Sequence, residues 1–356
     1  MKVLVTGHLG YIGSVLAPML AEAGHEVVGL DCDYYRRCTF GPGLAQFPAL
    51  IKDIRDVTLD DVRGFDAICH LAALSNDPLG NLDPDLTYDI NYRASVRLAE
   101  LAKQAGVQRF IFSSSCSLYG LAGDDFLTED SPFNPVTPYG ESKVLTEQEV
   151  TRLADGHFSP VFLRNATAYG VSPRLRFDLV LNNLMAWAFT TGKIYMKSDG
   201  SPWRPLAHIR DISRAFLAVL EAPRELVHNQ AFNVGSTREN LRVRAIAEIV
   251  SQTIPGCQVE FAPGASPDTR NYRVNCDKIT KVLTRFQPQW NVAKGAHELF
   301  QAYREQGITL NEFEGPRYQR IAHIRQLIGE GILDKGLRFQ QLTPAAAAIS
   351  AHGAKT

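Results

Sequence analysis

The segment Met1-Lys-Val-Leu-Val-Thr-Gly-His-Leu-Gly-Tyr-Ile-Gly13 decides the fold. Residues 3–5 form an apolar run long enough for a buried strand, and the apolar residues of 14–23 recur at helical spacing. Between these runs the glycines are spaced G-x-x-G-x-x-G, at Gly7, Gly10 and Gly13. A strand, a glycine turn and a helix form a phosphate cradle, because glycine allows close backbone approach and the helix start presents free N–H groups. We therefore predict a dinucleotide site here, with Tyr11 and Ile12 in the same loop.

A carboxylate follows the next predicted strand, at the position expected of a ribose ligand. The apolar run 26–30 ends at Asp31, about 20 residues after the glycine motif. An aspartate there accepts from both ribose hydroxyls and repels a 2′-phosphate, which favours NAD over NADP. Arg36 and Arg37 lie nearby and are of the residue type that serves a 2′-phosphate, so NADP stays open as an alternative.

The composition shows no bias toward nucleic acid or membranes. The chain has 356 residues and a net charge of −1, which gives no field that would attract nucleic acid or an anionic membrane. No apolar run reaches the roughly 18 residues that a membrane span needs. The six cysteines are scattered without a C-x-x-C pair, which indicates free thiols rather than disulfides or a zinc site. We expect a cytoplasmic protein without a bound metal, and without a signal peptide because the chain opens on a strand.

Strands alternate with helices through the first half of the chain. After the first two strands, apolar runs at 67–71, 110–112 and 161–164 alternate with helical patterns at 87–106 and 139–154. This order is typical of an α/β fold with a doubly wound parallel sheet, in which ligands collect beyond the carboxyl ends of the strands.

From about residue 169 the pattern loosens, which indicates a second, smaller lobe made of discontinuous pieces. A strand at 231–234 is expected to return to the main sheet. The predicted division is a nucleotide-binding domain at 1–168 with returning segments near 205–235, a substrate-binding lobe at 169–204 and 236–310, a helical appendage at 311–340 and a mobile tail at 341–356.

A tyrosine, a lysine and a serine supply the predicted chemistry. Tyr139-Gly-Glu-Ser-Lys143 opens a helix, so the phenol and the ammonium share a face at i and i+4. The ammonium stabilises a phenolate, which can then remove a proton from a sugar hydroxyl. Ser115 ends the preceding strand and can hydrogen-bond the same oxygen. The alternative is an ordinary exposed helix face, because Y-x-x-x-K is common by itself.

Together these motifs resemble the extended short-chain dehydrogenase/reductase family, and within it the nucleotide-sugar epimerases and dehydratases. The resemblance covers roughly residues 1–290 and rests on motifs that occur in family order: the glycine motif, Asp53-Ile54, His70-Leu-Ala-Ala73, Asn91, the serine run from Ser113 to Ser115, and Tyr139-x-x-x-Lys143. It implies a Rossmann-type domain, a bound NAD, a nucleoside-diphosphate sugar in the second lobe, and a homodimer.

The resemblance also assigns roles to single residues. It places adenine contacts on Asp53 and Ile54, and nicotinamide-ribose contacts on Tyr139 and Lys143. The remaining cofactor contacts would be Leu71, Ala72, Ala73, Asn91 and Ser113. The sugar nucleotide would be held by Ser115, Asn183, Arg204 and Arg270, where the arginines offer a fork suited to phosphate oxygens.

Two further expectations come from the same resemblance. His208, which lies close to Arg204 in sequence, is expected to be structural. The helices 91–105 and 139–154 would pair across a two-fold axis, with Val144, Leu145 and Val150 as candidate apolar contacts, unless these residues face the sheet instead.

The loop after Ser115 departs from the family's dehydratases. Those enzymes carry Thr-Asp-Glu where this chain has Ser115-Cys116-Ser117, and 4,6-dehydration is disfavoured without the acid pair. Some family members use a cysteine in this loop for proton transfer, but one residue later, at Ser117. Cys116 is therefore either a candidate acid/base or an inert buried thiol.

The leading hypothesis is an NAD-dependent nucleotide-sugar epimerase that works through a transient 4-keto sugar, with C4 as the expected carbon. The alternatives are a 4-ketoreductase or dehydrogenase with net redox, and a 3,5-epimerase that uses Cys116. A non-catalytic nucleotide-binding protein is a further alternative, against which the intact Ser115, Tyr139 and Lys143 argue.

Overall fold

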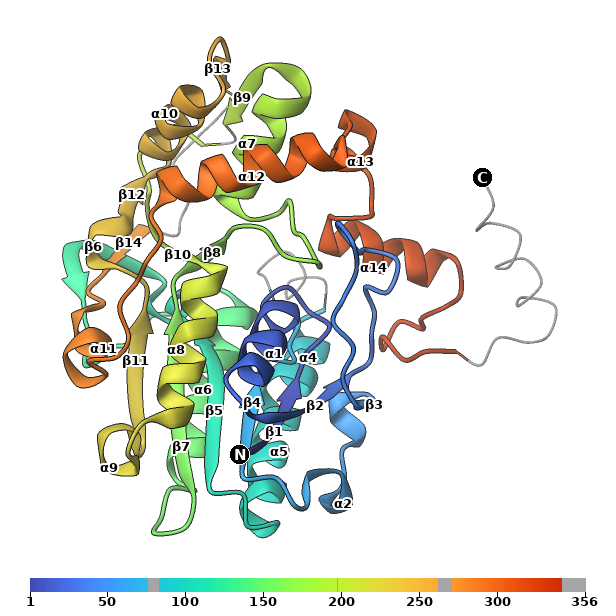
Figure 1. Ribbon diagram of the computed structural model, residues 1–356, viewed down its shortest axis with the longest axis vertical. Helices are drawn as coiled ribbons and strands as arrows, with labels where there is room; N and C mark the ends of the chain where they lie inside the picture. Colours follow the sequence, from blue (N-terminus) through green and yellow to red (C-terminus); the bar gives the residue numbers. More distant parts are fainter. Residues whose placement is uncertain (76–82, 197, 262–270, 341–356) are drawn as a thin grey trace.

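A seven-stranded parallel sheet forms the centre of the computed structural model (Figure 1), which describes residues 1–75, 83–196, 198–261 and 271–340. The strand order is β11-β7-β5-β4-β1-β2-β3, and every neighbouring pair is parallel. The order reverses direction between β1 and β4, which confirms the predicted doubly wound α/β class. The strands are β1 (Lys2–Thr6), β2 (Glu26–Asp31), β3 (Ala49–Ile51), β4 (Ala67–His70), β5 (Arg109–Ser115), β7 (Ser159–Asn165) and β11 (Gln230–Val234).

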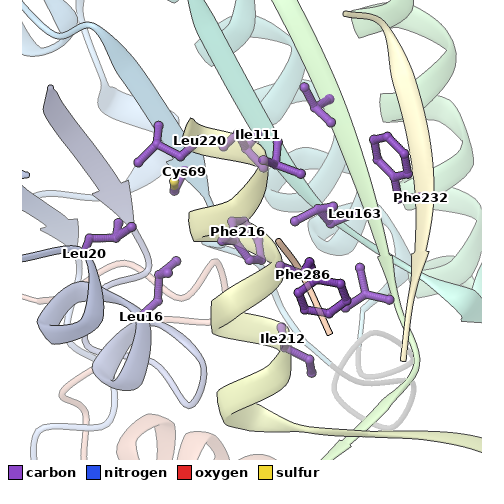
Figure 2. Close-up of a cluster of buried hydrophobic side chains, with 14 of the residues drawn as sticks. Leu16, Leu20, Cys69, Ile111, Leu163, Ile212, Phe216, Leu220, Phe232 and Phe286 are labelled. Atoms are coloured by element: carbon purple, nitrogen blue, oxygen red, sulfur yellow. The ribbon is translucent and has the colours of Figure 1, made fainter. Parts of the chain in front are cut away.

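Helices cover both faces of this sheet. On one face α1 (Gly13–Glu22) packs beside α8 (Ile209–Glu221). Figure 2 shows how Leu16 of α1 and Phe216 of α8 meet sheet residues such as Ile111 in a buried apolar cluster. On the other face lie α2 (Leu59–Val62), α5 (Ala94–Gln104) and α6 (Pro138–Thr151). The central strands β1, β4, β5 and β7 are therefore buried on both sides, which explains their apolar runs, whereas β3 is an exposed edge strand.

The helix predicted over 87–106 is interrupted in the structure. It consists of α4 (Pro84–Thr87), a π-helical segment η2 (Tyr88–Arg93) and α5. The first turn starts earlier than predicted because the Asp83 side chain accepts from the Leu86 N–H and caps it. The wide π turn holds Asn91, whose side chain bonds both backbone groups of Leu74.

The second lobe is made of discontinuous pieces above the carboxyl edge of the sheet (Figure 1). Its three-stranded sheet consists of β8 (Thr167–Tyr169), β10 (Trp203–His208) and β12 (Asn240–Arg242). Its apolar cluster is built mainly from α7 (Val180–Thr191), α10 (Val243–Thr253) and α12 (Val292–Gln306). Two small two-stranded sheets complete it, β9 (Lys193–Met196) with β13 (Gln258–Phe261) and β6 (Leu121–Leu127) with β14 (Asn271–Val274).

Shorter elements connect these parts. They are η1 (Ile54–Asp56), η3 (Cys116–Tyr119), α9 (Arg224–Val227), η4 (Thr237–Glu239) and α11 (Asp277–Val282). Across the part of the chain that the structure describes, no helix combines the length and apolar character of a membrane span.

The appendage after the second lobe folds back onto the nucleotide-binding domain. It contains α13 (Leu310–Glu314) and α14 (Arg320–Gly329), followed by a turn in which Leu333 and Phe339 form a β-bridge. Ile324 and Leu327 of α14 enter the apolar cluster beneath β1 and β2. The appendage therefore covers the edge of the sheet that carries Asp31. The tail predicted at 341–356 lies outside the described residues.

Candidate active site

A cavity of about 850 Å³ lies where the carboxyl edge of the main sheet meets the second lobe. Residues from both parts of the molecule line it, and most of the residues predicted from the sequence are among them. Those are Gly7, Gly10, Tyr11, Ile12, Gly13, Asp31, Asp53, Ile54, Leu71, Ala72, Ala73, Ser113, Ser115, Tyr139, Lys143, Asn183 and Arg204. Arg270 lies outside the described residues.

The glycine loop has the shape of a phosphate cradle. Gly7 has φ +75°, and a Cβ at this position would lie 2.8 Å from the amide nitrogen of Ala72. A Cβ on Gly13 would lie 2.1 Å from the carbonyl oxygen of Gly7. Only glycine fits at either position, and α1 begins at Gly13 with its positive dipole end toward the cavity. These residues fit the diphosphate of a dinucleotide.

Asp31 is held rigidly at the end of β2. Its Oδ2 accepts from the N–H of Leu9 at 3.0 Å, and its Oδ1 accepts from the N–H of Asp33 at 2.8 Å. Arg36 and Arg37, the two candidates for binding a 2′-phosphate of NADP, make other contacts. Arg37 pairs with Glu330 of the appendage at 2.6 Å, and the Arg36 guanidinium lies 4.9 Å from the ring centroid of Phe339.

Asp53 lines the cavity, but its carboxylate is already paired. Arg55 binds it through two hydrogen bonds of 3.0 and 2.7 Å, and Arg338 of the appendage lies 3.3 Å away. These arginines hold the pKa of Asp53 below its ordinary value, although burial acts in the opposite direction. Any adenine contact from this residue would therefore come from a charged, fixed carboxylate or from the backbone.

The predicted catalytic residues meet at the carboxyl end of β5. Helix α6 begins beside it because Thr137 accepts from the Gly140 N–H at 3.2 Å and Pro138 occupies the first turn. This places Lys143 under the strand, where its Nζ donates to the carbonyl oxygen of Ser113 at 2.8 Å. The same Nζ lies 5.6 Å from the ring centroid of Tyr139.

Burial sets the chemistry of Lys143. The side chain is 3% exposed, and desolvation lowers its pKa to about 7, partly offset by the charge of Glu147. A lysine in this state can change its protonation near neutral pH. Ser115 lies at the same strand end, where its Oγ accepts from the N–H of Ser117 at 3.2 Å.

Two candidate residues do not line the cavity: Asn91, an expected cofactor contact, and Cys116, whose burial fits the alternative of an inert thiol. Asn91 lies behind the cavity wall, where it bonds the Leu74 N–H at 2.7 Å and the Leu74 carbonyl at 3.0 Å. It can therefore act on the site only through the backbone it holds. Cys116 is fully buried outside the lining, and its thiol donates to the Arg164 carbonyl oxygen at 3.1 Å. Burial raises the pKa of this thiol well above its ordinary value.

Ser117, unlike Cys116, lines the cavity. Its Oγ is buried and has no hydrogen-bond partner among the described residues. This is the position at which the family's dehydratases carry the second acid. A hydroxyl there can donate or accept a hydrogen bond, but it does not replace a carboxylic acid.

The second lobe contributes two polar side chains to the lining of the same cavity. Asn183 donates to the Phe177 carbonyl at 2.8 Å, and Arg204 donates to the Trp203 carbonyl at 2.8 Å. Both line the cavity. His208 does not, because it is stacked on Trp290 at 3.8 Å between ring centroids and its Nε2 lies 2.9 Å from a Glu298 carboxylate oxygen.

Sequence reasoning missed several lining residues. Arg176 belongs to a loop that the sequence marks as basic, in Pro173-Arg-Leu-Arg-Phe177, but nothing in the pattern places it at the cavity. Arg320 comes from the appendage, and no motif marks it. Tyr195 and Tyr272 lie at strands that the sequence pattern did not predict.

A family model described as the NAD dependent epimerase/dehydratase family matches residues 3–235. The chain belongs to this family. The UDP-glucose 4-epimerase of Neisseria meningitidis serogroup B is 30% identical over 284 residues, which cover 71% of this chain and 84% of that enzyme. The UDP-glucose 4-epimerase of Mycolicibacterium smegmatis is 30% identical over 320 residues, covering 85% of this chain and 99% of that enzyme.

Solved structures agree with the family. MoeE5 in complex with UDP-glucuronic acid and NAD is 26% identical, with a TM-score of 0.74 over 86% of this chain and 99% of MoeE5. The UDP-glucuronic acid 4-epimerase of Bacillus cereus shares the fold at 23% identity, with a TM-score of 0.72 over 86% of this chain and 99% of that one. The predicted enzyme class, Rossmann-type fold and NAD cofactor are thereby confirmed.

Proposed function

We propose that this enzyme is a nucleotide-sugar 4-epimerase, which inverts C4 of a nucleoside-diphosphate sugar through a transient 4-keto sugar. The observation that carries the proposal is the position of Lys143 under Tyr139 at the carboxyl end of β5, facing a cavity with a second lobe above it. The curated relatives, which are UDP-glucose 4-epimerases, support the same reaction.

The residues of this chain would act on one hydroxyl of the sugar. Tyr139 accepts the proton of the 4-hydroxyl and returns it after the keto sugar has turned, while Lys143 stabilises the phenolate. Ser115 donates a hydrogen bond to the same oxygen and holds it beside the phenol. Bound NAD would supply the hydride acceptor for the oxidation at C4 and the hydride donor for the reduction that follows.

Asn183 and Arg204 are the proposed contacts to the sugar nucleotide. They enter the cavity from α7 and β10 of the second lobe. The buried guanidinium of Arg204 is suited to the diphosphate. Arg270 stays a candidate on the family resemblance alone.

Net redox is the second candidate function. A 4-ketoreductase or dehydrogenase would use the same serine, tyrosine and lysine, so the residues around C4 do not separate it from an epimerase. Simple 4,6-dehydration is less well supported, because Cys116 and Ser117 stand where the dehydratases carry two acids.

The test is product stereochemistry without added cofactor. The purified protein would be incubated with UDP-glucose, UDP-galactose, UDP-glucuronic acid and UDP-N-acetylglucosamine, and each product assigned by NMR. An epimerase yields a mixture of C4 epimers from one of these sugars with no net change in nicotinamide absorbance. Stoichiometric NADH would instead assign a dehydrogenase. As a control, Tyr139→Phe should bind NAD normally and lose turnover by ~10²–10⁴-fold.

We further propose a homodimer in a reducing compartment. The family pairs two helices that correspond to α5 and α6 here, and α6 carries the partly exposed Leu145. All six cysteines are free thiols, which supports a cytoplasmic location.

A further inference from the structure

Arg320 is a buried cation that enters the cofactor cavity from the appendage. It is the first residue of α14 and is 2% exposed. Its neighbours Gln319 and Ile321 also line the cavity. The appendage is therefore part of the site as well as a cover for the sheet edge.

One end of the Arg320 guanidinium is engaged and the other is not. Nη2 donates to the Arg174 carbonyl at 2.8 Å, and the guanidinium carbon lies 3.8 Å from the ring centroid of Tyr35. Nη1 is buried and has no hydrogen-bond partner among the residues that the structure describes. Burying a charged donor without a hydrogen-bond partner destabilises a protein by roughly several kcal/mol, and a ligand that supplies the acceptor removes this cost.

The arginines beside it are paired with acids of their own. Arg174 binds Asp33 at 2.9 Å, and Arg176 binds Asp178 at 2.7 Å. Arg320 adds a third positive charge to this group. Burial lowers the pKa of Arg320, and the nearby Arg176 lowers it further. The local balance therefore favours an incoming anion.

The position of these three arginines indicates which anion they would bind. Arg320 stacks on Tyr35, which follows Asp31 by four residues, and the Arg176 guanidinium lies 5.9 Å from the ring centroid of Tyr11 in the glycine loop. A nucleotide that spans from Asp31 to the start of α1 places its diphosphate between these points. Asn183 and Arg204, the proposed contacts to the sugar nucleotide, come from other elements.

We propose that Arg320 binds the diphosphate of the bound dinucleotide, and that the appendage thereby holds the cofactor in the site. The appendage is anchored on the same loop, because the Tyr34 hydroxyl donates to the Leu337 carbonyl at 2.7 Å and Arg37 pairs with Glu330. Release of the dinucleotide then requires the appendage to give up its Arg320 contact. The proposal rests on NAD binding and not on the proposed epimerase reaction, so either can fail without the other.

The test compares ligands that differ in their phosphates. Dissociation constants for NAD, ADP, UDP and adenosine would be measured by calorimetry on the full-length protein freed of nucleotide. Arg320→Gln should weaken NAD and ADP by ~10–100-fold, the size of a charged hydrogen bond, and leave adenosine unchanged. Arg320→Lys keeps the charge and should retain more of the affinity. Arg325→Gln, at an exposed position of the same helix, is the matched control and should leave all four dissociation constants unchanged.

Several outcomes would overturn the proposal. Unchanged NAD affinity in Arg320→Gln would make the residue purely structural. An equal loss for adenosine would show that the variant disturbs the loop rather than a phosphate contact. A loss for UDP but not for ADP would assign Arg320 to the diphosphate of the sugar nucleotide. If Arg320→Gln does not fold, by circular dichroism, the Lys variant decides: adenosine weakened as much as ADP contradicts the proposal.

Discussion

Lys143 is buried, although its proposed role of stabilising the Tyr139 phenolate requires a positive charge. Desolvation lowers its pKa from 10.5 to about 7 in the native state. Lys143 therefore loses its proton at a lower pH in the native state than in the unfolded chain. Below about pH 7 both states are charged, and the burial cost is largest, on the order of 5 kcal/mol. Between pH 7 and pH 10.5 the native state is neutral while the unfolded state still binds the proton, so stability rises with pH in this window.

We therefore predict a pH-dependent difference between Lys143→Met and the wild type, both free of nucleotide. The variant should gain stability relative to the wild type at low pH, and this difference should shrink by about 2–3 kcal/mol between pH 6 and pH 9. The lost hydrogen bond to Ser113 adds only a constant offset, because the neutral amine also donates. Urea unfolding of both proteins across this range measures the slope. A difference that does not vary with pH would mean that Lys143 keeps an ordinary pKa.

Cys116 should be silent in the reaction. Its thiol is fully buried, donates to a backbone carbonyl and is held protonated by its surroundings, so it is a poor base. Cys116→Ala is expected to retain turnover within a few-fold, and the wild-type product should carry no carbon-bound deuterium from solvent. Activity with NMR of products in D₂O measures both. Deuterium in the wild-type product, lost in the variant, would instead indicate proton transfer at C3 or C5.

Residues predicted from the sequence line the cavity where the motif and the local fold coincide. The glycine loop, Asp31 and Tyr139 each follow a strand or open a helix, so local pattern fixes their place. Arg320 could not be predicted in this way, because the appendage reaches the cavity through tertiary packing and no local motif marks it. Asn91 also depends on a distant partner, the backbone of Leu74, which a motif does not display.

Helix α14 should contribute to stability through a small apolar face. Leu327 is 3% exposed and packs in the cluster beneath β1 and β2. Leu327→Ala is expected to lower the free energy of unfolding by ~2–5 kcal/mol, since it removes apolar contact and leaves a cavity. Urea unfolding measures the loss, and Arg325→Ala, an exposed position of the same helix, is the control that should change it little. An unchanged midpoint for Leu327→Ala would mean that the appendage is only loosely attached.

Element boundaries show where local patterns stop being sufficient. The central strands of the main sheet are predicted closely, because burial on both faces gives them apolar runs, whereas the exposed edge strand β3 is not predicted. The helix predicted at 87–106 instead contains the π segment η2, which reflects the bonds of Asn91 to a neighbouring loop. The strands β6, β9, β13 and β14, which are not predicted, form only two-stranded sheets at the margin of the second lobe.

The whole molecule joins its two lobes at the glycine loop itself. The Tyr11 hydroxyl donates to the Gly170 carbonyl at 2.7 Å, and Ser14 lies 3.0 Å from Ser172 between their hydroxyl oxygens. The cofactor cradle therefore sets the position of the second lobe, which carries the proposed substrate contacts. A substitution that moves the glycine loop is therefore expected to shift the proposed substrate contacts as well.

Dimerisation is the prediction that belongs to the whole molecule. Two of the three candidate contact residues do not support it, because both are buried within the chain: Val150 in the cluster on the main sheet and Val144 in a cluster with residues of η3 and β14. Leu145 is the third and stays partly exposed on α6. On α5, Val96 and Leu101 are also only partly buried, so both helices keep apolar surface available to a second copy.

We expect a homodimer in sedimentation equilibrium at micromolar concentration, and a monomer for Leu145→Arg, because two arginines would face each other across the two-fold axis. Ala293→Arg places the same charge on an exposed position of α12 in the second lobe and should stay dimeric. Circular dichroism of each variant shows whether the fold is kept. A monomeric wild type, or a Leu145→Arg variant that stays dimeric and folded, would move the interface away from α6 or remove it.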